Sequence, residues 1–477
     1  MPVNLRIVTT PIVGGARPGN GRPRRVDAAL LEAVLPGPGR DRLGAGEVLV
    51  VTTGQQPGLF TGPLFTVYKA LTAVVLARKL ERERRVPVVP VFWVAGDDHD
   101  FAEANHVWIL DAGGDAARIA LPERPADAPL APLAREPCGA DIGPALDALR
   151  ERTPDSEFKG AVLEWLGAAY RPEATLAQAF AQAMHALLGP RGLAVFQAHH
   201  PAAKRVMAPL VLQALDVTLD DGHLPVLLEA SRGRDRLRGE NGGYVTRRSG
   251  ERFSRQDLEG IAARQPERLS ANVLLRPALE AALFPTVAYA AGPGELEYFP
   301  QAGPLYRVLD GGVEPQPAVA RWSGILVEGR VDKVLEKHGL TLDDLEGAPG
   351  ALEARLVRDT LPPETAGLFD QVRKSVEAEF GRLAGAVARV DPTLERTVQS
   401  VRNAALGGTV EVEKKLVASL KRANETLVGQ LARARAAVYP AGKPQERALT
   451  LASFLIRYGP ALVDEIEGEV ARWAGVP

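Results

Sequence analysis

The chain has 477 residues, which is long enough for a large hydrophobic core and for more than one structural unit. Its 57 basic and 59 acidic side chains give a formal net charge of −2, which excludes a global field drawing the chain onto nucleic acid or an anionic membrane. The single cysteine, Cys138, excludes an internal disulfide framework and a thiolate zinc cage, and no nearby histidine could activate it as a nucleophile. Because neither a signal-peptide pattern nor a membrane-spanning apolar run occurs, we expect a soluble, cytoplasmic protein.

After an irregular, Gly-, Pro- and Arg-rich lead-in over residues 1–45 with one short helix, the chain predicts a strand, a glycine-rich loop and a helix. Residues 48–51 are apolar and β-branched, and beyond Pro63 apolar residues recur at helical spacing. Glycines permit tight turns, and the first turn of a helix has unpaired N–H groups that bind phosphate or carboxylate. A tight turn without a ligand is the alternative. The candidate binding residues are Thr53, Gly54, Gln55, Gln56, Gly58, Thr61, Gly62 and Lys69, the last with a solvent-facing position as its alternative.

A second apolar strand, predicted over 86–95, runs directly into acidic residues and a histidine. In open α/β sheets ligands bind outside the carboxyl ends of the strands, so this turn and the glycine loop should face one crevice. His99 is the best general-base candidate, with Asp98 or Asp100 orienting it. Binding of a divalent metal is disfavoured because adjacent loop residues point in different directions, and helix capping by the two aspartates is the structural alternative. The candidate residues here are Trp93, Asp97, Asp98, His99, Asp100 and His106.

Two insertions, at about 112–190 and 220–270, are predicted within a core of residues 1–330. The second contains Arg232, Arg234, Arg236 and Arg238, which could gather a carboxylate-bearing substrate or simply face solvent. A strand over 285–291 then leads into a helix beginning near Gly292. Its candidate binding residues are Gly292, Gly294, Glu295 and Tyr298. Glu295 could instead stabilise the helix dipole. Whether Arg276 and Arg321 bind substrate or face solvent is undecided from the sequence.

Residues 331–438 predict a helical arm with heptad-like apolar seams. One seam runs from Val372 to Val390, and after Gly407 and Gly408 another continues to Val438. The seams predict an antiparallel hairpin, which buries its apolar residues within one chain or against a second copy, and we expect a homodimer. Residues 439–477 should form a segment that packs back on the core. The residues thus predict an α/β protein with a mostly parallel sheet and a C-terminal α-helical coiled-coil domain.

In their order and in their amino-acid sequences, these segments resemble the cysteine-adding enzymes of bacillithiol biosynthesis. The resemblance rests on residues 53–58 and 61–69, on 90–101 and on the segment around 292–295, with weaker similarity at 243–248 and 445–447. The family usually has Glu where this chain has Asp97. The resemblance implies a Rossmann-like core, a dimerising coiled coil, nucleotide binding, and a ligase that joins the carboxyl of L-cysteine to the amine of glucosaminyl malate.

Amide formation from a carboxylate requires activation, so we expect ATP/ADP as a cosubstrate, with Mg²⁺ arriving alongside the nucleotide and no permanent metal. The sequence lacks His-x-Gly-His and Lys-Met-Ser-Lys-Ser strings, so the form of activation stays open. The expected partners are the two small substrates and a second copy of the chain, without nucleic acid or membrane. A nucleotide-binding transferase acting on another small substrate and a non-enzymatic coiled-coil scaffold are the alternatives.

Overall fold

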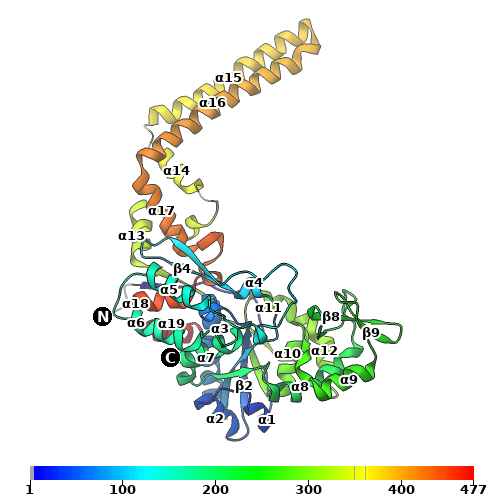
Figure 1. Ribbon diagram of the computed structural model, residues 1–477. Coiled ribbons are helices and arrows are strands. Elements are labelled where there is room, and N and C mark those ends of the chain that lie inside the picture. The colour runs from blue at the N-terminus through cyan, green and yellow to red at the C-terminus, as the bar shows by residue number, and fades with distance from the viewer. Residues whose placement is uncertain (1–4, 349, 360, 362, 477) are drawn as a thin grey trace. The chain divides into compact units, whose positions relative to one another are not determined.

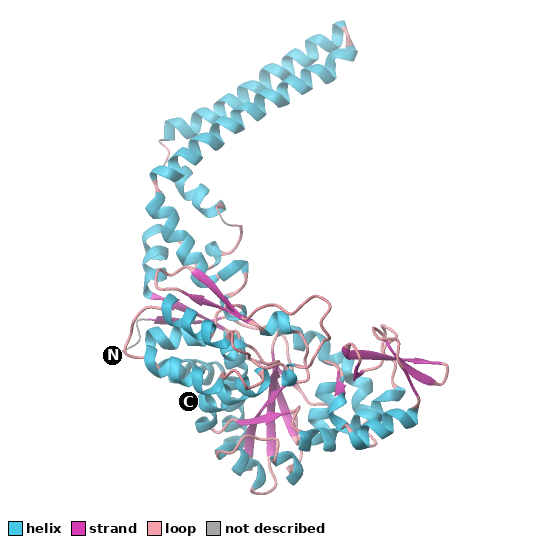
Figure 2. Ribbon diagram, viewed as in Figure 1, coloured by secondary structure: helices cyan, strands magenta, loops and turns pink. Residues whose placement is uncertain are grey.

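The computed structural model describes residues 5–348, 350–359, 361 and 363–476. The chain divides into two units (Figures 1 and 2). The first contains the chain up to Val327 and again from Lys443, and the second is Glu328–Gly442. Among the described residues, no helix is both long and apolar enough to cross a membrane.

A five-stranded parallel sheet forms the centre of the first unit, in the order β13-β12-β2-β3-β6. Its strands are β2 (Leu49–Gln55), β3 (Val88–Val94), β6 (Ala194–Gln197), β12 (Thr286–Ala291) and β13 (Ala318–Ala320). The chain builds outward from β2 through β3 to β6 and then returns to the other side of β2 with β12. The order therefore reverses between β2 and β12, the position at which Rossmann-like sheets bind ligands. The predicted α/β fold with a parallel sheet is confirmed.

Alternating side chains of the central strands supply two separate cores. Val50 of β2 and Val91 of β3 belong to a cluster with Leu30 of α1 (Ala28–Leu31). Leu49 and Val51 belong to another, with apolar residues of α3 (Leu64–Arg84). This two-sided burial explains why the strands read as unbroken apolar runs rather than alternating ones. The helix α2 (Pro38–Gly44) lies against β3 and β6.

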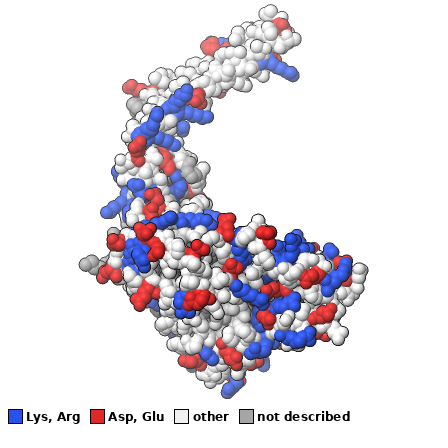
Figure 3. Space-filling model, viewed as in Figure 1, with Lys and Arg blue, Asp and Glu red and all other residues white. Residues whose placement is uncertain are grey.

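An antiparallel sheet, visible at the right of Figure 2, accounts for most of the second predicted insertion. Its order is β10-β9-β8-β7-β11, and helices α8, α9, α10 and α12 accompany it (Figure 1). Lys and Arg are frequent over this part of the unit, interspersed with Asp and Glu (Figure 3). The elements are β7 (Val226–Ala230), β8 (Gly233–Glu240), β9 (Gly243–Thr246), β10 (Arg252–Phe253), β11 (Leu269–Ala271), α8 (Pro201–Gln213), α9 (Arg255–Arg264), α10 (Leu275–Leu283) and α12 (Gly303–Val308).

The remaining elements of the first unit surround the parallel sheet. The first predicted insertion contains β5, which pairs with the preceding β4, and the α-helices α5, α6 and α7. The C-terminal segment forms α18 and α19, which pack against α6 and α3 respectively. The irregular lead-in also contains β1, which pairs with β14. These elements are β1 (Leu5–Thr9), α4 (Phe101–Ala104), β4 (His106–Leu110), β5 (Ala116–Ala120), α5 (Ile142–Arg152), α6 (Lys159–Ala169), α7 (Leu176–Leu188), α11 (Pro293–Tyr298), β14 (Gly324–Glu328), α18 (Leu451–Tyr458) and α19 (Ala461–Trp473).

The second unit is helical throughout its regular elements. Helices α15 (Pro363–Val390) and α16 (Glu395–Ala423) pair along their length, with Arg373 on one helix bonded to Glu413 on the other at 2.8 Å. Gly407 and Gly408 lie inside α16, and the seam predicted beyond them continues into α17, with a break between the two helices at Asn424. The unit also contains α13 (Gly329–His338), α14 (Ala351–Asp359) and α17 (Glu425–Val438).

Candidate functional site

The acidic turn after β3 is held by its own backbone hydrogen bonds. Asp98 Oδ1 accepts the N–H of His99 at 2.7 Å and that of Asp100 at 3.2 Å. Asp100 caps the following helix by accepting the N–H of Glu103 at 3.0 Å. Gly96 opens the turn, and a Cβ there would collide with the His199 ring. The helix capping that we considered as an alternative therefore occurs for Asp100. Neither Asp98 nor His99 caps this helix.

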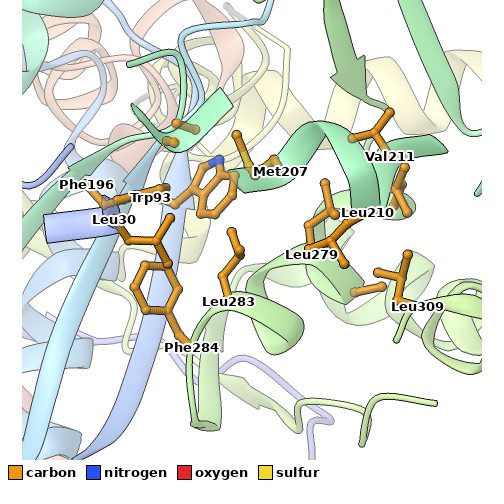
Figure 4. Packing of buried hydrophobic residues seen from close by; sticks show 14 of the residues in the cluster. Leu30, Trp93, Phe196, Met207, Leu210, Val211, Leu279, Leu283, Phe284 and Leu309 are labelled. Carbon is orange, nitrogen blue, oxygen red and sulfur yellow. The ribbon is translucent and has the colours of Figure 1, made fainter. Parts of the chain in front are cut away.

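Asp97, Asp98 and His99 line a cavity of about 230 Å³ at the carboxyl end of β3. Residues of β8, the segment Leu269–Val273 and Trp93 also line it. Figure 4 shows this indole beside Met207, with Val211 and Leu279 farther along the same apolar cluster. The cavity lining therefore combines apolar, acidic and basic side chains, which suits a small polar molecule carrying both charges.

Lys204 joins the acidic turn to β11. Its Nζ donates to Asp97 Oδ2 at 2.6 Å and to the carbonyl of Leu269 at 2.8 Å, and the side chain is only 3% exposed. Burial lowers the pKa of Lys204, and the adjacent Asp97 opposes that shift. Burial also lowers the pKa of the neighbouring His199 to about 4, so this imidazole is neutral at pH 7. Asp97 is thus a carboxylate already paired by the protein.

Arg234 faces the acidic turn from β8. Its Nε donates to Ser270 Oγ at 2.9 Å, its Nη2 to the carbonyl of Ala271 at 2.6 Å, and its Nη1 lies 3.3 Å from His99 Nδ1. No described carboxylate forms an ion pair with this half-buried guanidinium. Burial lowers its pKa, against the influence of Asp98 and Asp97. Of the cations that line the cavity, Arg234 is the one available to a substrate anion.

A second charged cluster lies where the strand order reverses. Lys69 Nζ donates to the carbonyl of Gly54 at 2.6 Å, to Gln55 Oε1 at 3.3 Å and to Glu295 Oε1 at 2.7 Å. Lys69 is buried, not solvent-facing, and burial lowers its pKa to about 8 despite Glu295. Burial would raise the pKa of Glu295, but Lys69 and Arg276 lower it overall.

Arg276 joins this cluster to the cavity. It is one of the cavity-lining residues, and its Nη2 lies 3.2 Å from Glu295 Oε1. The same Nη2 donates to the hydroxyls of Tyr289 at 3.1 Å and Tyr298 at 3.2 Å. The end of β2, the turn after β3 and the start of α11 therefore meet around one group of residues, as the sheet topology predicts. Gly292 closes the cluster by donating its N–H to Glu295 Oε2 at 2.8 Å.

The turn around Gly58 lies apart from this group. The Tyr170 hydroxyl donates to the Gly58 carbonyl at 2.6 Å and accepts the Thr61 N–H at 2.9 Å. The first N–H of α3, from Leu64, donates to the carbonyl of Leu449 at 2.8 Å. The C-terminal segment therefore satisfies the first of the N–H groups that we expected this helix to offer to an anion. Gly58, Thr61 and Gly62 serve a buried turn.

The other predicted residues also fall outside the cavity lining. Thr53 bonds the carbonyl of Ala290 at 2.8 Å inside the sheet, and His106 Nδ1 lies 3.0 Å from the carbonyl of Ala102. Gln56 bonds Glu103, and Gly294 has open space where a Cβ would stand. Arg321, undecided from the sequence, makes a two-point ion pair with Glu446 at 2.9 and 2.8 Å and holds the C-terminal segment.

Sequence reasoning missed Lys204, Ser270 and the special position of Arg234 within its arginine run. A signal for Lys204 exists, since it follows the strand β6 and a histidine pair by one helical turn. The alternation of β8 places Arg234 on one face with Arg236 and Arg238, opposite the buried Asp235 and Leu237, and does not single Arg234 out. Ser270 carries no such signal. In the described ranges, no three His, Cys, Asp or Glu side chains gather in a metal-binding arrangement.

A parallel sheet in Rossmann order, with a charged cavity beside its topological reversal, defines a Rossmann-like ligand-binding protein. The family model "Bacillithiol biosynthesis BshC, N-terminal Rossmann-like domain" matches residues 40–223 and 217–313. The model "Bacillithiol biosynthesis BshC, C-terminal coiled-coil domain" matches residues 324–471. The chain belongs to the BshC family of bacillithiol biosynthesis, as its motifs predict.

Similar curated proteins extend over nearly the same length. A protein of Symbiobacterium thermophilum is 32% identical, with 96% of this chain and 89% of the relative aligned. One of Salinibacter ruber is 33% identical over 88% of this chain and 80% of the relative, and one of Heliobacterium modesticaldum is 31% identical over 91% and 83%. All three carry the name "Putative cysteine ligase BshC".

Proposed function

We propose that this protein is a ligase that joins the carboxyl of L-cysteine to the amine of glucosaminyl malate. The observation that carries the proposal is the cavity in which Asp98 and His99 face Arg234, in a chain of the BshC family. Both substrates are small and carry carboxylate and ammonium groups. The cavity offers each kind of partner, a free carboxylate and a guanidinium, among its lining residues.

The basic side chains of the lining suit the malyl carboxylates. Arg234 has no carboxylate partner of its own, and Arg236 lines the same cavity with its side chain half exposed. A guanidinium binds a carboxylate through two parallel hydrogen bonds, which fixes orientation as well as charge. Asp98 in the same lining would then receive the amine of the sugar.

The cysteine carboxylate must be activated before an amine can displace one of its oxygens. We propose that a nucleoside triphosphate, bound with Mg²⁺, supplies a phosphoryl or adenylyl group to that carboxylate. In the following step the amine nitrogen forms a bond to the acyl carbon, the bond from that carbon to the phosphate oxygen breaks, and the phosphate leaves with the electron pair. Before this step the substrate ammonium gives one proton to a protein carboxylate, and as the amide forms the nitrogen loses a second proton to the departing phosphate.

The direct test is reconstitution with L-cysteine, glucosaminyl malate and ATP, followed by mass spectrometry of the thiol product and by nucleotide analysis. We expect the amide product together with stoichiometric nucleotide cleavage. Formation of the product without nucleotide consumption would contradict activation of the cysteine carboxylate by ATP. Cleavage of nucleotide with a different acceptor in a substrate screen would favour the alternative transferase.

Asp98→Asn and His99→Ala separate a catalyst from a scaffold. If these groups act on substrate, turnover should fall by a factor on the order of 10²–10⁴ while folding is retained. Asp115→Asn, an exposed carboxylate in the turn between β4 and β5, is the matched control and should leave turnover unchanged. Equal activity of all variants would contradict an active site in this cavity.

We also propose that the helical arm binds a second copy of the chain. Leu368, Val372 and Val412 are 57%, 45% and 58% exposed and line one apolar groove of the α15–α16 hairpin together with Phe369. A two-helix hairpin leaves such a groove open, whereas pairing two hairpins closes it. Light scattering should give a dimer at micromolar concentration and a monomer for Val372→Glu. The control Val390→Glu, which lies outside the groove, should stay dimeric, and a monomeric unmodified protein would overturn the proposal.

A further inference from the structure

The contact between Arg234 and His99 determines which ring nitrogen of His99 carries a proton. Two bonds, to Ser270 Oγ and to the carbonyl of Ala271, hold the guanidinium in one orientation, and the remaining Nη1 lies 3.3 Å from His99 Nδ1. A guanidinium has five donors and no acceptor, and it does not deprotonate in proteins. The nitrogen that faces it must therefore present a lone pair.

We infer that Arg234 holds His99 as the neutral tautomer with its proton on Nε2, so that His99 acts as a hydrogen-bond donor to the substrate while Asp98 receives the proton of the amine. The tautomer follows from the contact alone. The two roles rest on the proposed ligase function. His99 as the general base, our expectation from the sequence, is replaced by this assignment because its lone pair is already engaged by Arg234.

The charges around His99 favour the same neutral form. Burial has the largest effect and lowers the pKa of His99 below its usual value, and Arg234 and then Arg248 lower it further. Asp98 and Asp100 act in the opposite direction without reversing the shift. An imidazolium would also place an N–H against the N–H of the guanidinium. At pH 7 the ring is therefore neutral, with Nε2–H as its only donor.

Asp98 can still accept a proton, whereas the lone pair of His99 is engaged by Arg234. Its Oδ1 accepts two backbone N–H groups, and neither oxygen has a charged partner among the described residues. Asp98 lines the cavity beside His99. An ammonium group bound there would lie next to an unpaired carboxylate. The ammonium gives one proton to that carboxylate before its nitrogen attacks the acyl carbon, and the nitrogen loses a second proton to the departing phosphate as the amide forms. The negative charge developing on the acyl oxygen is stabilised by His99 Nε2–H.

Beside its proposed contact with a substrate carboxylate, Arg234 thus positions His99, and nuclear magnetic resonance can test this effect without any turnover. In protein labelled with ¹⁵N-histidine, long-range proton–nitrogen correlations distinguish the two tautomers and the imidazolium. The chain has seven histidines, and His99→Gln assigns the signal. We expect a protonated Nε2 and an unprotonated Nδ1 at pH 7. A protonated Nδ1 or an imidazolium would overturn the inference.

Arg234→Met should remove the preference, giving a mixture of tautomers and a higher histidine pKa, whereas Arg234→Lys should retain part of it. Arg238→Met on the same strand is the control, since Arg238 pairs with Glu240 at 3.0 Å and does not line the cavity. An unchanged His99 spectrum in Arg234→Met would also contradict the inference. These results do not depend on the substrate, so failure of the proposed function is distinguishable from failure of the tautomer assignment.

Kinetics then tests the roles. His99→Gln keeps an N–H donor and should retain more activity than His99→Ala, which should lose a factor on the order of 10²–10³, the effect of one oxyanion donor. The pH profile of kcat/KM should have the same acidic limb in His99→Gln as in the unmodified enzyme. Disappearance of that limb would show that His99 is the base after all.

Discussion

Replacement of Glu295 by Gln tests whether the charged cluster at the strand reversal stabilises the first unit. Glu295 Oε1 accepts from Lys69 at 2.7 Å, from Arg276 at 3.2 Å and from Tyr289 at 2.6 Å. Its side chain is 12% exposed and that of Lys69 is 3% exposed. Glu295→Gln removes the one negative charge that both cations share and leaves them buried near each other.

Breaking a buried ion pair by removing one partner costs about 3–5 kcal/mol. The two cations share one carboxylate, so we expect one such loss rather than two. Arg276 keeps a contact with Glu280 at 3.4 Å, and this limits the effect further. A loss of that size is a large part of the roughly 5–15 kcal/mol that stabilises a typical domain, so the variant should fold but unfold at much lower urea.

Tryptophan fluorescence reports on the first unit alone. The five tryptophans, Trp93, Trp108, Trp165, Trp322 and Trp473, all belong to that unit. Urea unfolding followed by fluorescence therefore measures Glu295→Gln without interference from the helical arm. The exposed Glu297→Gln on the same helix is the control, expected to change stability by less than about 0.5 kcal/mol. A Glu295→Gln loss below about 1 kcal/mol would refute the reasoning, since buried pairs lose several times more.

Two further predictions use buried titratable groups. Burial raises the pKa of Cys138 to about 12, so a thiol reagent at pH 8 should label the native protein very slowly and the urea-unfolded protein rapidly, and fast native labelling would contradict this. Burial raises the pKa of Glu280 from 4.5 to about 7 although Arg276 lowers it, so this carboxyl destabilises the fold progressively as pH rises from 4.5 to 7, by about 3 kcal/mol in all. The Tm of Glu280→Gln should therefore rise relative to that of the unmodified protein over this range, and a constant difference would rule the effect out.

The sequence predicts the sheet and one side of the site because both depend on local order. Strand β3 is a short apolar run, and the acidic turn follows it directly, so the rule that ligands lie at carboxyl ends of strands leads to Asp98 and His99. Lys69 also follows from its place one turn or more into the helix after β2. The sequence pattern does not predict which side chain each of these candidate residues contacts.

Those partners are far away in the chain. Arg234 lies 135 residues from His99, and Tyr170 lies 109 residues from Thr61. The glycine turn shows the consequence: Gly58 and Gly62 have the composition of an anion-binding loop, but Tyr170 and Leu449 satisfy that turn from within the protein. Local spacing identifies groups capable of chemistry. Only the tertiary fold decides whether a ligand or another part of the chain satisfies them.

The structure of a complex with glucosaminyl malate tests the central claim most directly. We expect the sugar's amine beside Asp98, with a malyl carboxylate bonded to Arg234, inside the cavity of about 230 Å³. Binding of the substrate elsewhere, with this cavity empty at saturating concentration, would contradict the account.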